Sequence, residues 1–250
     1  MRQVTAIGFD LFDTLITVER LGLHEALGRL LRCLQEQGLA VQQEAFVPLY
    51  REASRRFVEE ARSHGRETHN RFWISAALHQ AGYAVSPEDP RIAQAVEAYF
   101  SAFLDYAALL PDTHNMLTAL KGRYRLGLLS NFTHGPAAKA ILDRLGVTPF
   151  LEVTVISGEI GYRKPHAQAF DVLSDRFGVP REQIAFVGDD LDNDVHGARQ
   201  AGLLPIWTTC ARAHKSAQTT ESSLWTGAVA DPAVPTVASW GELLTLLGGE

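Results

Sequence analysis

Four short segments of this 250-residue chain carry side chains that could do chemistry together. Each lies at the end of an apolar stretch or in a loop that follows one. They are FDLFDTL (9–15), LGLLSN (126–131), GYRKP (161–165) and FVGDDLDND (186–194). Between them they offer a carboxylate, a hydroxyl, a lysine and a cluster of acids. Together these groups could attack the phosphorus of a phosphoryl group, neutralise the negative charge of that group and hold a metal ion.

The carboxylate of Asp10 follows Val4–Phe9, a short apolar run that predicts a buried strand. In open parallel sheets, ligands bind at the edge where the strands end. An aspartate there could ligate a metal or act as a nucleophile. The simpler alternative is an aspartate that stabilises a turn through its own backbone.

Ser130 and Asn131 end a second apolar strand, and Lys164 precedes a proline. The hydroxyl and the nearby backbone N–H groups could bind a phosphoryl oxygen, and the lysine could neutralise developing negative charge. Because it precedes a proline, Lys164 is expected to be extended rather than helical. A turn serine and a surface lysine are the alternatives for each residue alone.

Four aspartates, at 189, 190, 192 and 194, follow a third apolar strand. Clustered carboxylates repel one another unless a cation lies among them. An EF-hand does not fit, because counting from Asp190 the sixth position is Val195 and the twelfth is Ala201. A Mg²⁺ site shared with Asp10 fits better, since Mg²⁺ takes few carboxylates and fills its other positions with water and substrate phosphate. An acidic start to the next helix is the alternative.

Composition narrows the class of protein. The formal net charge is −6, which argues against a nucleic-acid partner, and no apolar run approaches a membrane span. Cys33 and Cys210 show no metal-ligand or disulfide spacing, and the first residues show no targeting pattern. We therefore expect a cytoplasmic protein that binds neither nucleic acid nor a membrane. The oligomeric state stays open.

The helices and strands that must position these motifs fall into two regions with different sequence patterns. From Glu19 to Leu109 the pattern predicts helices and no strand, over Leu21–Gly38, Glu44–Ser63, Asn70–Ala81 and Pro90–Ala107. After Pro111, helices and strands alternate, which is typical of βαβ units and a parallel sheet. The expected strands are Arg125–Leu129, Glu152–Ile156, Gln183–Val187 and Leu204–Trp207; the helices are Thr113–Lys121, Pro136–Leu145, Ala167–Phe177, Asp194–Ala201 and Trp240–Leu247. Ser216–Ser223 is expected to be a loop.

The predicted fold class is therefore α/β, with a Rossmann-like parallel-sheet core and an inserted all-helical domain. Residues 1–17 and 109–250 should form the core, and residues 18–108 the insertion.

The ordered set of motifs resembles the haloacid dehalogenase superfamily of phosphatases and dehalogenases. The inserted helices look like that superfamily's helical cap, and the resemblance covers essentially the whole chain. The residues that carry it are Asp10, Thr14, Ser130, Lys164-Pro165 and Gly188-Asp189 with Asp194.

The resemblance implies a role for each motif. Asp10 would attack substrate phosphorus and form an aspartyl-phosphate. The backbone carbonyl of Phe12 and the carboxylates of Asp10 and Asp189 would ligate Mg²⁺, with Asp194 supporting the metal or Lys164. The transferring phosphoryl group would be held by Ser130, Asn131 and Lys164.

Phe12 departs from the family's phosphatase pattern. An aspartate usually stands two residues after the nucleophile as general acid and base, whereas this chain has Phe12 and then Asp13. A phenyl ring cannot transfer a proton, a step that contributes typically about 10²–10⁴-fold. Members that act on haloacids also carry an aromatic residue at this position. Asp13 could be a substitute acid, although neighbouring side chains need not point the same way.

The acidic cluster favours the opposite conclusion. Displacing halide needs no metal, and the family's dehalogenases lack the intact Gly-Asp…Asp arrangement that this chain retains. We therefore expect a Mg²⁺-dependent phosphatase acting on a small phosphate monoester. A 2-haloacid dehalogenase and a catalytically weak binding or regulatory protein are the alternatives.

Overall fold

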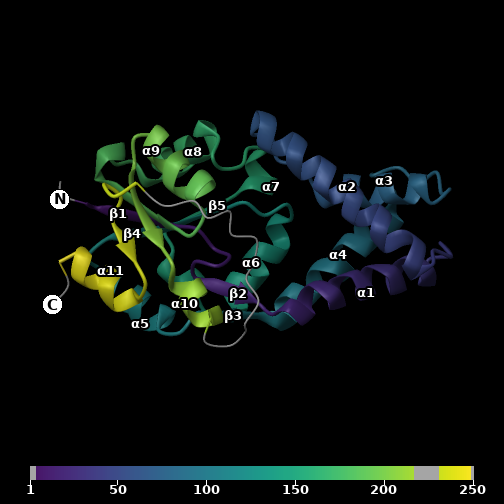
Figure 1. Cartoon of the computed structure of the whole chain (residues 1–250), viewed down its shortest axis with the longest axis horizontal. Coiled ribbons are helices and arrows are strands. Elements are labelled where there is room, and N and C mark those ends of the chain that lie inside the picture. The colour runs from purple at the N-terminus through teal and green to yellow at the C-terminus, as the bar shows by residue number, and fades with distance from the viewer. Residues whose placement is uncertain (1–3, 217–230, 249–250) are drawn as a thin grey trace.

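The computed structural model describes residues 4–216 and 231–248. At its centre lies a parallel sheet of six strands in the order β5-β4-β1-β6-β7-β8 (Figure 1). The strands are β1 (Ala6–Phe9), β4 (Arg125–Ser130), β5 (Val153–Ile156), β6 (Ile184–Gly188), β7 (Leu204–Thr208) and β8 (Thr236–Val237). Because β1 pairs with both β4 and β6, the first strand lies in the middle of the sheet. The α/β class with a Rossmann-like core is confirmed.

Helices cover both faces of this sheet (Figure 1). Alternate side chains of each strand point to opposite faces, and each face is apolar. Ile7 and Phe9 pack with the helices α5, α6 and α11, while Ala6 packs with α8 and α9. The helices of this part are α5 (Thr113–Leu120), α6 (Gly135–Arg144), α7 (Ser157–Ile160), α8 (Ala167–Phe177), α9 (Gly197–Gln200), α10 (Cys210–Ser216) and α11 (Trp240–Leu246).

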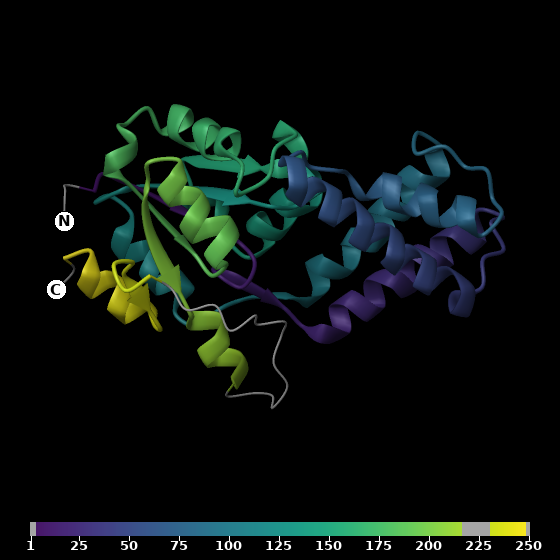
Figure 2. The same ribbon diagram turned by 45° about the horizontal axis from the view of Figure 1, so that its top comes forward.

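A separate group of four helices extends away from the sheet (Figure 2). Its members are α1 (Arg20–Glu36), α2 (Gln43–His64), α3 (Asn70–Gln80) and α4 (Pro90–Tyr106). The buried side chains of α1 recur at intervals of three to five residues, at Ala26, Leu30, Leu31 and Leu34, which places them on one helix face. They belong to one apolar cluster that continues into the sheet's core.

Two short antiparallel strands connect the helical group to the sheet. These are β2 (Ile16–Val18) and β3 (Ala107–Leu109), which pair with Ile16 opposite Leu109. The expectation of no strand between Glu19 and Leu109 is therefore wrong, and α4 ends one residue before the predicted Ala107. Strands of three residues are too short to show the alternation that identifies a strand in a sequence.

Other differences from the sequence-based expectations are local. A π-helix over Leu191–His196 precedes α9, where the pattern predicted a helix from Asp194 to Ala201. The strand β8 and the helices α7 and α10 were not predicted, and two 3₁₀ turns cover Thr148–Phe150 and Arg181–Gln183. Of the expected loop Ser216–Ser223, Ser216 ends α10 and the remainder lies outside the described residues. Among the residues described, no helix is both long and apolar enough to cross a membrane.

Candidate active site

Three charged side chains from three segments meet at the edge where the parallel strands end. Asp10 follows β1, Asp194 lies in the π-helix after β6, and Lys164 lies in the loop between α7 and α8. The Lys164 ammonium donates to Asp10 Oδ1 and to Asp194 Oδ1, both at 2.6 Å. All three are buried, and Lys164 is only 1% exposed. The lysine is therefore not a surface residue but the shared partner of two carboxylates.

The loop after β6 fixes the two aspartates of the acidic cluster. A Cβ atom on Gly188 would lie 2.3 Å from the Asp194 carboxyl carbon, so only glycine fits here. Asp194 Oδ2 accepts from the backbone N–H of Asp190, at 2.9 Å. The backbone carbonyl of Asp189 accepts from the indole N–H of Trp207, at 2.9 Å. Neighbouring elements thus hold this loop against the sheet edge.

The remaining aspartates of the run have other surroundings. Asp190 caps the π-helix, because its Oδ1 accepts from the backbone N–H groups of Asp192 and Asn193. Asp192 is exposed, and its Oδ1 lies 3.2 Å from Nδ1 of His196. Only Asp189 and Asp194 of this run reach the buried group around Asp10.

Two acids of this group, Asp189 and Asp194, have strongly raised pKa values. Burial, followed by the charges of Asp10 and Asp194, raises the pKa of Asp189 to about 9. Burial raises the pKa of Asp194 to about 7, although Lys164 opposes the shift. Burial alone would lower the pKa of Lys164, but the two carboxylates outweigh it and the pKa is raised. The cluster therefore holds more negative charge than one lysine can balance.

A divalent cation would relieve this excess. Asp10, Asp189 and Asp194 each offer one carboxylate oxygen, and these three oxygens lie within 4.8 Å of one another. All-oxygen donor sets with few carboxylates suit hard cations such as Mg²⁺. Both oxygens of Asp194 are already engaged, one by Lys164 and the other by a backbone N–H group. Asp10 and Asp189 are the better-placed ligands, and the donor set fits the ion.

Two buried hydroxyls at the ends of neighbouring strands lack a protein partner among the residues described. They are Ser130 Oγ at the end of β4 and Thr14 Oγ1 in the turn after β1. Ser130 is 1% exposed and Thr14 is fully buried. Because a buried hydroxyl without a hydrogen bond is costly, both groups are available to a bound ligand.

The side chain of Asn131 makes two hydrogen bonds with the backbone of Lys164. Its amide donates to the Lys164 carbonyl at 3.0 Å and accepts from the Lys164 N–H at 2.8 Å. With both side-chain groups engaged, the side chain holds the lysine's backbone. A role of Asn131 in binding substrate phosphate stays a prediction.

Phe12 lies among aromatic rings instead of beside a proton donor. It stacks on Phe132, with ring centroids 5.0 Å apart, and meets the edge of Phe103 in α4 at 6.4 Å. Asp13 has a left-handed backbone, with φ at 57°. Its charge is one of the causes that raise the pKa of Asp189, so Asp13 is close to the acidic cluster.

Sequence reasoning missed the residues through which the helical group meets this edge. Glu67 lies between α2 and α3, and its carboxylate accepts from Ser157 Oγ at 2.6 Å. It also pairs with Arg163, the neighbour of Lys164, at 3.3 Å. No pattern in the sequence connects residue 67 with residues 157 and 163, because only the fold brings them together.

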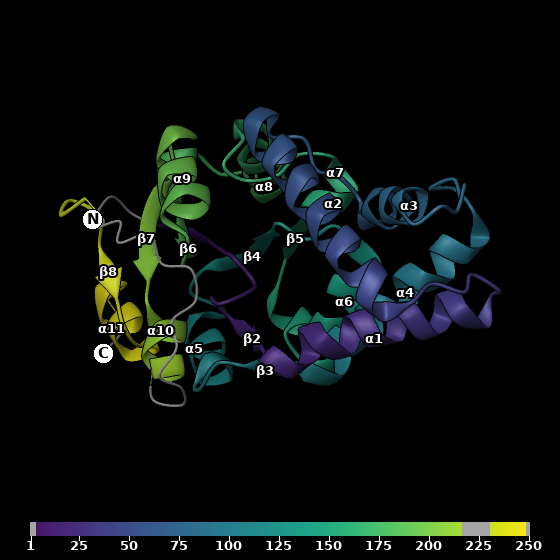
Figure 3. The same cartoon turned by 45° about the vertical axis from the view of Figure 1, so that its right-hand side comes forward.

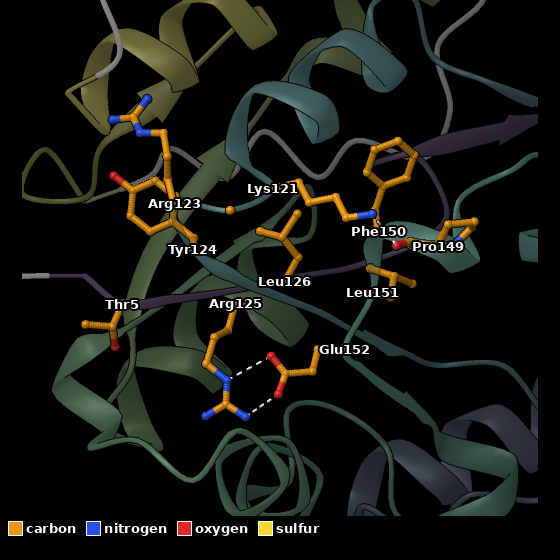
Figure 4. Close-up of a pocket in the computed structure, with 11 residues that line it drawn as sticks. Thr5, Lys121, Arg123, Tyr124, Arg125, Leu126, Pro149, Phe150, Leu151 and Glu152 are labelled. Atoms are coloured by element: carbon orange, nitrogen blue, oxygen red, sulfur yellow. Dashed lines mark hydrogen bonds and ion pairs between the residues drawn. The ribbon is translucent and has the colours of Figure 1, made fainter.

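A depression of about 530 Å³ lies at the opposite edge of the sheet, where β1 and β4 begin (Figure 4). Its cations are already paired: Lys121 with the Pro149 carbonyl, Arg123 with the Gly248 carbonyl, and Arg125 with Glu152. This depression has none of the candidate site residues, and its position is opposite to the edge where such sheets bind ligands.

Comparison with known proteins identifies the same family along most of the chain. A model of haloacid dehalogenase-like hydrolases matches residues 4–202. The glyceraldehyde 3-phosphate phosphatase of Methanopyrus kandleri is 33% identical over 207 residues, which cover 82% of this chain and 83% of that protein.

Two solved structures share the fold. A 2-haloacid dehalogenase from Pseudomonas syringae has a TM-score of 0.73 at 21% identity, over 98% of this chain and 99% of that one. The magnesium-bound HAD-hydrolase YfnB of Bacillus subtilis has a TM-score of 0.64 at 18% identity, again over 98% and 99%. The full-length fold, helical group included, is therefore shared with a 2-haloacid dehalogenase and with a magnesium-bound HAD-hydrolase.

Proposed function

Because this chain belongs to the haloacid dehalogenase-like hydrolase family, we propose that it is a Mg²⁺-dependent phosphatase that acts through Asp10 on a small phosphate monoester. The observation that supports this best is the cluster of Asp10, Asp189 and Asp194, in which Asp10 and Asp194 pair with the buried Lys164. The positive charge of a single lysine cannot balance the negative charge of three carboxylates. A lysine together with a divalent cation can do so, and the two can also bind the substrate's phosphoryl group.

Asp10 is the proposed nucleophile. Its carboxylate attacks phosphorus, the bond to the leaving oxygen breaks, and an aspartyl-phosphate forms on Asp10. Water then attacks that phosphorus and releases inorganic phosphate, which restores the free carboxylate. Lys164, 2.6 Å from Asp10 Oδ1, stabilises negative charge on the transferring group in both steps.

Other residues of the site would bind and orient the phosphoryl group. The hydroxyl of Ser130 is buried and has no protein partner among the described residues, so it would donate to a phosphoryl oxygen. Asn131 keeps Lys164 in place through its two backbone contacts. Asp10, Asp189 and the Phe12 carbonyl would hold Mg²⁺, with Asp194 fixing Lys164. The ion would neutralise phosphoryl charge that the lysine alone cannot.

The helices α1–α4, from residue 18 to residue 108, would form a cap over this edge. The contacts of Glu67 with Ser157 and Arg163, and of Phe103 with Phe12, support this role. The Methanopyrus relative is named for a phosphorylated three-carbon sugar. A small phosphorylated metabolite of that kind is the substrate class proposed for this chain.

The test is a paired assay of the purified protein. Hydrolysis of an aryl phosphate should require Mg²⁺ and should stop when a chelator removes it. The same preparation should release no halide from a 2-haloacid. Halide release that persists in chelator, without phosphatase activity, would overturn the proposal.

A 2-haloacid dehalogenase is the second candidate, and the aromatic surroundings of Phe12 favour it. In that reaction Asp10 would attack carbon, halide would leave, and water would attack the Asp10 carboxyl carbon of the ester. Turnover in ¹⁸O-water separates the two: a dehalogenase places the label in Asp10, whereas a phosphatase places it in phosphate.

A further inference from the structure

We propose that residues 65–67 of the helical group form a latch that positions Lys164, with Glu67 as the residue that makes the connection. This inference rests on the proposed function, since it concerns the lysine of that site. The latch joins the end of α2 to the loop that carries Lys164. Figure 3 shows that end of α2 lying close to α7 and α8.

The backbone of the latch pairs with the Lys164 loop. The Arg163 N–H donates to the Gly65 carbonyl, and the Glu67 N–H donates to the Gly161 carbonyl, both at 3.0 Å. Arg66 and Tyr162 form the antiparallel bridge between these bonds, with the guanidinium 4.3 Å from the ring centroid. Gly65 is required at the corner, because its φ is +70° and a Cβ there would lie 2.4 Å from His166.

The Glu67 carboxylate reaches deeper than the backbone bridge. Its side chain is 2% exposed and lies against Ser157, which is fully buried, and Arg163, whose side chain is 12% exposed. Oε2 accepts from Ser157 Oγ at 2.6 Å, and Oε1 faces the Arg163 guanidinium at 3.3 Å. A buried carboxylate with this many partners is strongly disfavoured if one partner is lost.

Ser157 carries the connection to the other side of the site. Its Oγ accepts from the Phe132 N–H at 2.9 Å, and Phe132 stacks on Phe12. The residue before Phe132 is Asn131, whose side chain holds the Lys164 backbone. From Glu67, one path therefore reaches Lys164 through Arg163, and the other through Ser157 and Asn131.

These two paths close a ring of contacts that passes through the Lys164 backbone and includes one residue of the helical group. Docking of the latch would hold the loops after β4 and before α8 in the arrangement where Lys164 Nζ meets Asp10. Without Glu67, both loops lose a shared anchor. Glu67 touches neither Asp10 nor Lys164, so it is a positioning residue.

Kinetics of three variants test this, with an aryl phosphate and saturating Mg²⁺. Glu67→Ala should lower kcat by about 10–100-fold with little change in KM, the scale of a misplaced catalytic group. Glu67→Gln should restore much of that loss, because its amide oxygen can still accept from Ser157. Glu59→Ala, at an exposed position on α2, is the matched control and should behave like the wild type.

A double-mutant cycle tests whether Ser157 transmits the effect. If it does, Glu67→Ala should cost clearly less in the Ser157→Ala background than in the wild type. Purely additive losses would overturn the path through Ser157. An unchanged kcat in Glu67→Ala, or a rise in KM alone, would overturn the positioning role itself.

Amide hydrogen exchange separates this inference from the proposed function. Glu67→Ala should accelerate exchange at the Arg163 and Lys164 N–H groups and leave β1 and β6 protected. If the wild type proves inactive on phosphate esters, the proposed function fails while faster exchange still supports the latch. Unchanged exchange at those two groups would reject the latch whatever the activity.

Discussion

At the scale of single residues, the chemistry depends on which carboxylate attacks. Asp10→Asn should lower phosphatase kcat by about 10⁴-fold or more, which is the scale of the loss in kcat when the nucleophile of other enzymes is removed. The neutral amide is a poor nucleophile, although its shape still fits. Steady-state assays should show this loss, and Asp175→Asn, at an exposed site on α8, should show none. Near-normal turnover by Asp10→Asn would remove Asp10 from the role.

The second residue-scale prediction concerns the leaving group. With Phe12 in the place of a general acid, the wild type should prefer aryl phosphates, whose leaving groups need no proton, over alkyl phosphates. Phe12→Asp should narrow that preference by at most about 10²-fold. A new carboxyl group that is not well oriented toward the leaving oxygen supplies only part of the rate gain of general acid catalysis. The ratio of kcat/KM for the two substrates measures it.

Asp13→Ala is the control for that experiment. Asp13 lies near enough to raise the pKa of Asp189, so it is a candidate for the missing acid. A large loss confined to alkyl phosphates would show that Asp13 donates the proton. The interpretation of Phe12 as a deficit would then be wrong.

The residues of the candidate site could be predicted from the sequence to different extents. Asp10, Ser130 and Asp189 follow apolar strands, and strands of a parallel sheet end at one edge, so their convergence was predictable. The side chain of Asn131 was not, because its contacts depend on where the distant Lys164 loop lies. Glu67 carries no local signal at all, since its partners are about 90 to 96 residues away.

At the scale of elements, length decided what could be predicted. Helices such as α1 and α4 repeat an apolar stripe over many residues, and both were expected within a residue or two of their ends. The strands β2, β3 and β8 have three, three and two residues, too few to show a period. The π-helix over Leu191–His196 is a rare conformation that residue propensity does not encode.

The start of α3 gives a pH-dependent prediction. His69 caps this helix by accepting from the Arg71 N–H, and burial, then His134 and Arg71, lowers its pKa to about 4. Between about 4 and its ordinary value of 6.5, an unfolded His69 binds a proton that the folded one does not. Stability should therefore fall as pH drops through that window.

His69→Asn should reduce this loss, since asparagine also caps helices but does not titrate. Thermal unfolding at several pH values between about 4 and 7 should show a smaller drop in Tm for the variant. Parallel curves for the two proteins would show that His69 contributes nothing to the acid sensitivity.

At the scale of the whole molecule, the acidic cluster should link metal binding to stability. The pKa of Asp189 is raised from 3.8 to about 9, so the folded state keeps a proton that the unfolded state loses across that range. Without metal, stability should thus decline as pH rises through it. Asp189→Asn should flatten the decline, which melting curves measured in chelator across this range can check.

Adding Mg²⁺ should restore the stability that the metal-free acidic cluster loses as the pH rises. At 100-fold excess over its Kd the ion should add about 2.7 kcal/mol to the free energy of unfolding. For a chain of this size that is about 5–10 °C in Tm. KCl at equal ionic strength should give no such rise, and Asp189→Asn should lose it. An equal rise in that variant would place the ion elsewhere.

The central claim is that phosphoryl transfer passes through Asp10 with the help of a divalent cation. The most direct measurement is mass spectrometry of peptides from enzyme quenched in acid during turnover of an aryl phosphate. We predict one added phosphoryl group on the peptide that contains Asp10, present with Mg²⁺ and absent with chelator. Phosphate release without that label, or a label on any other residue, would contradict the account.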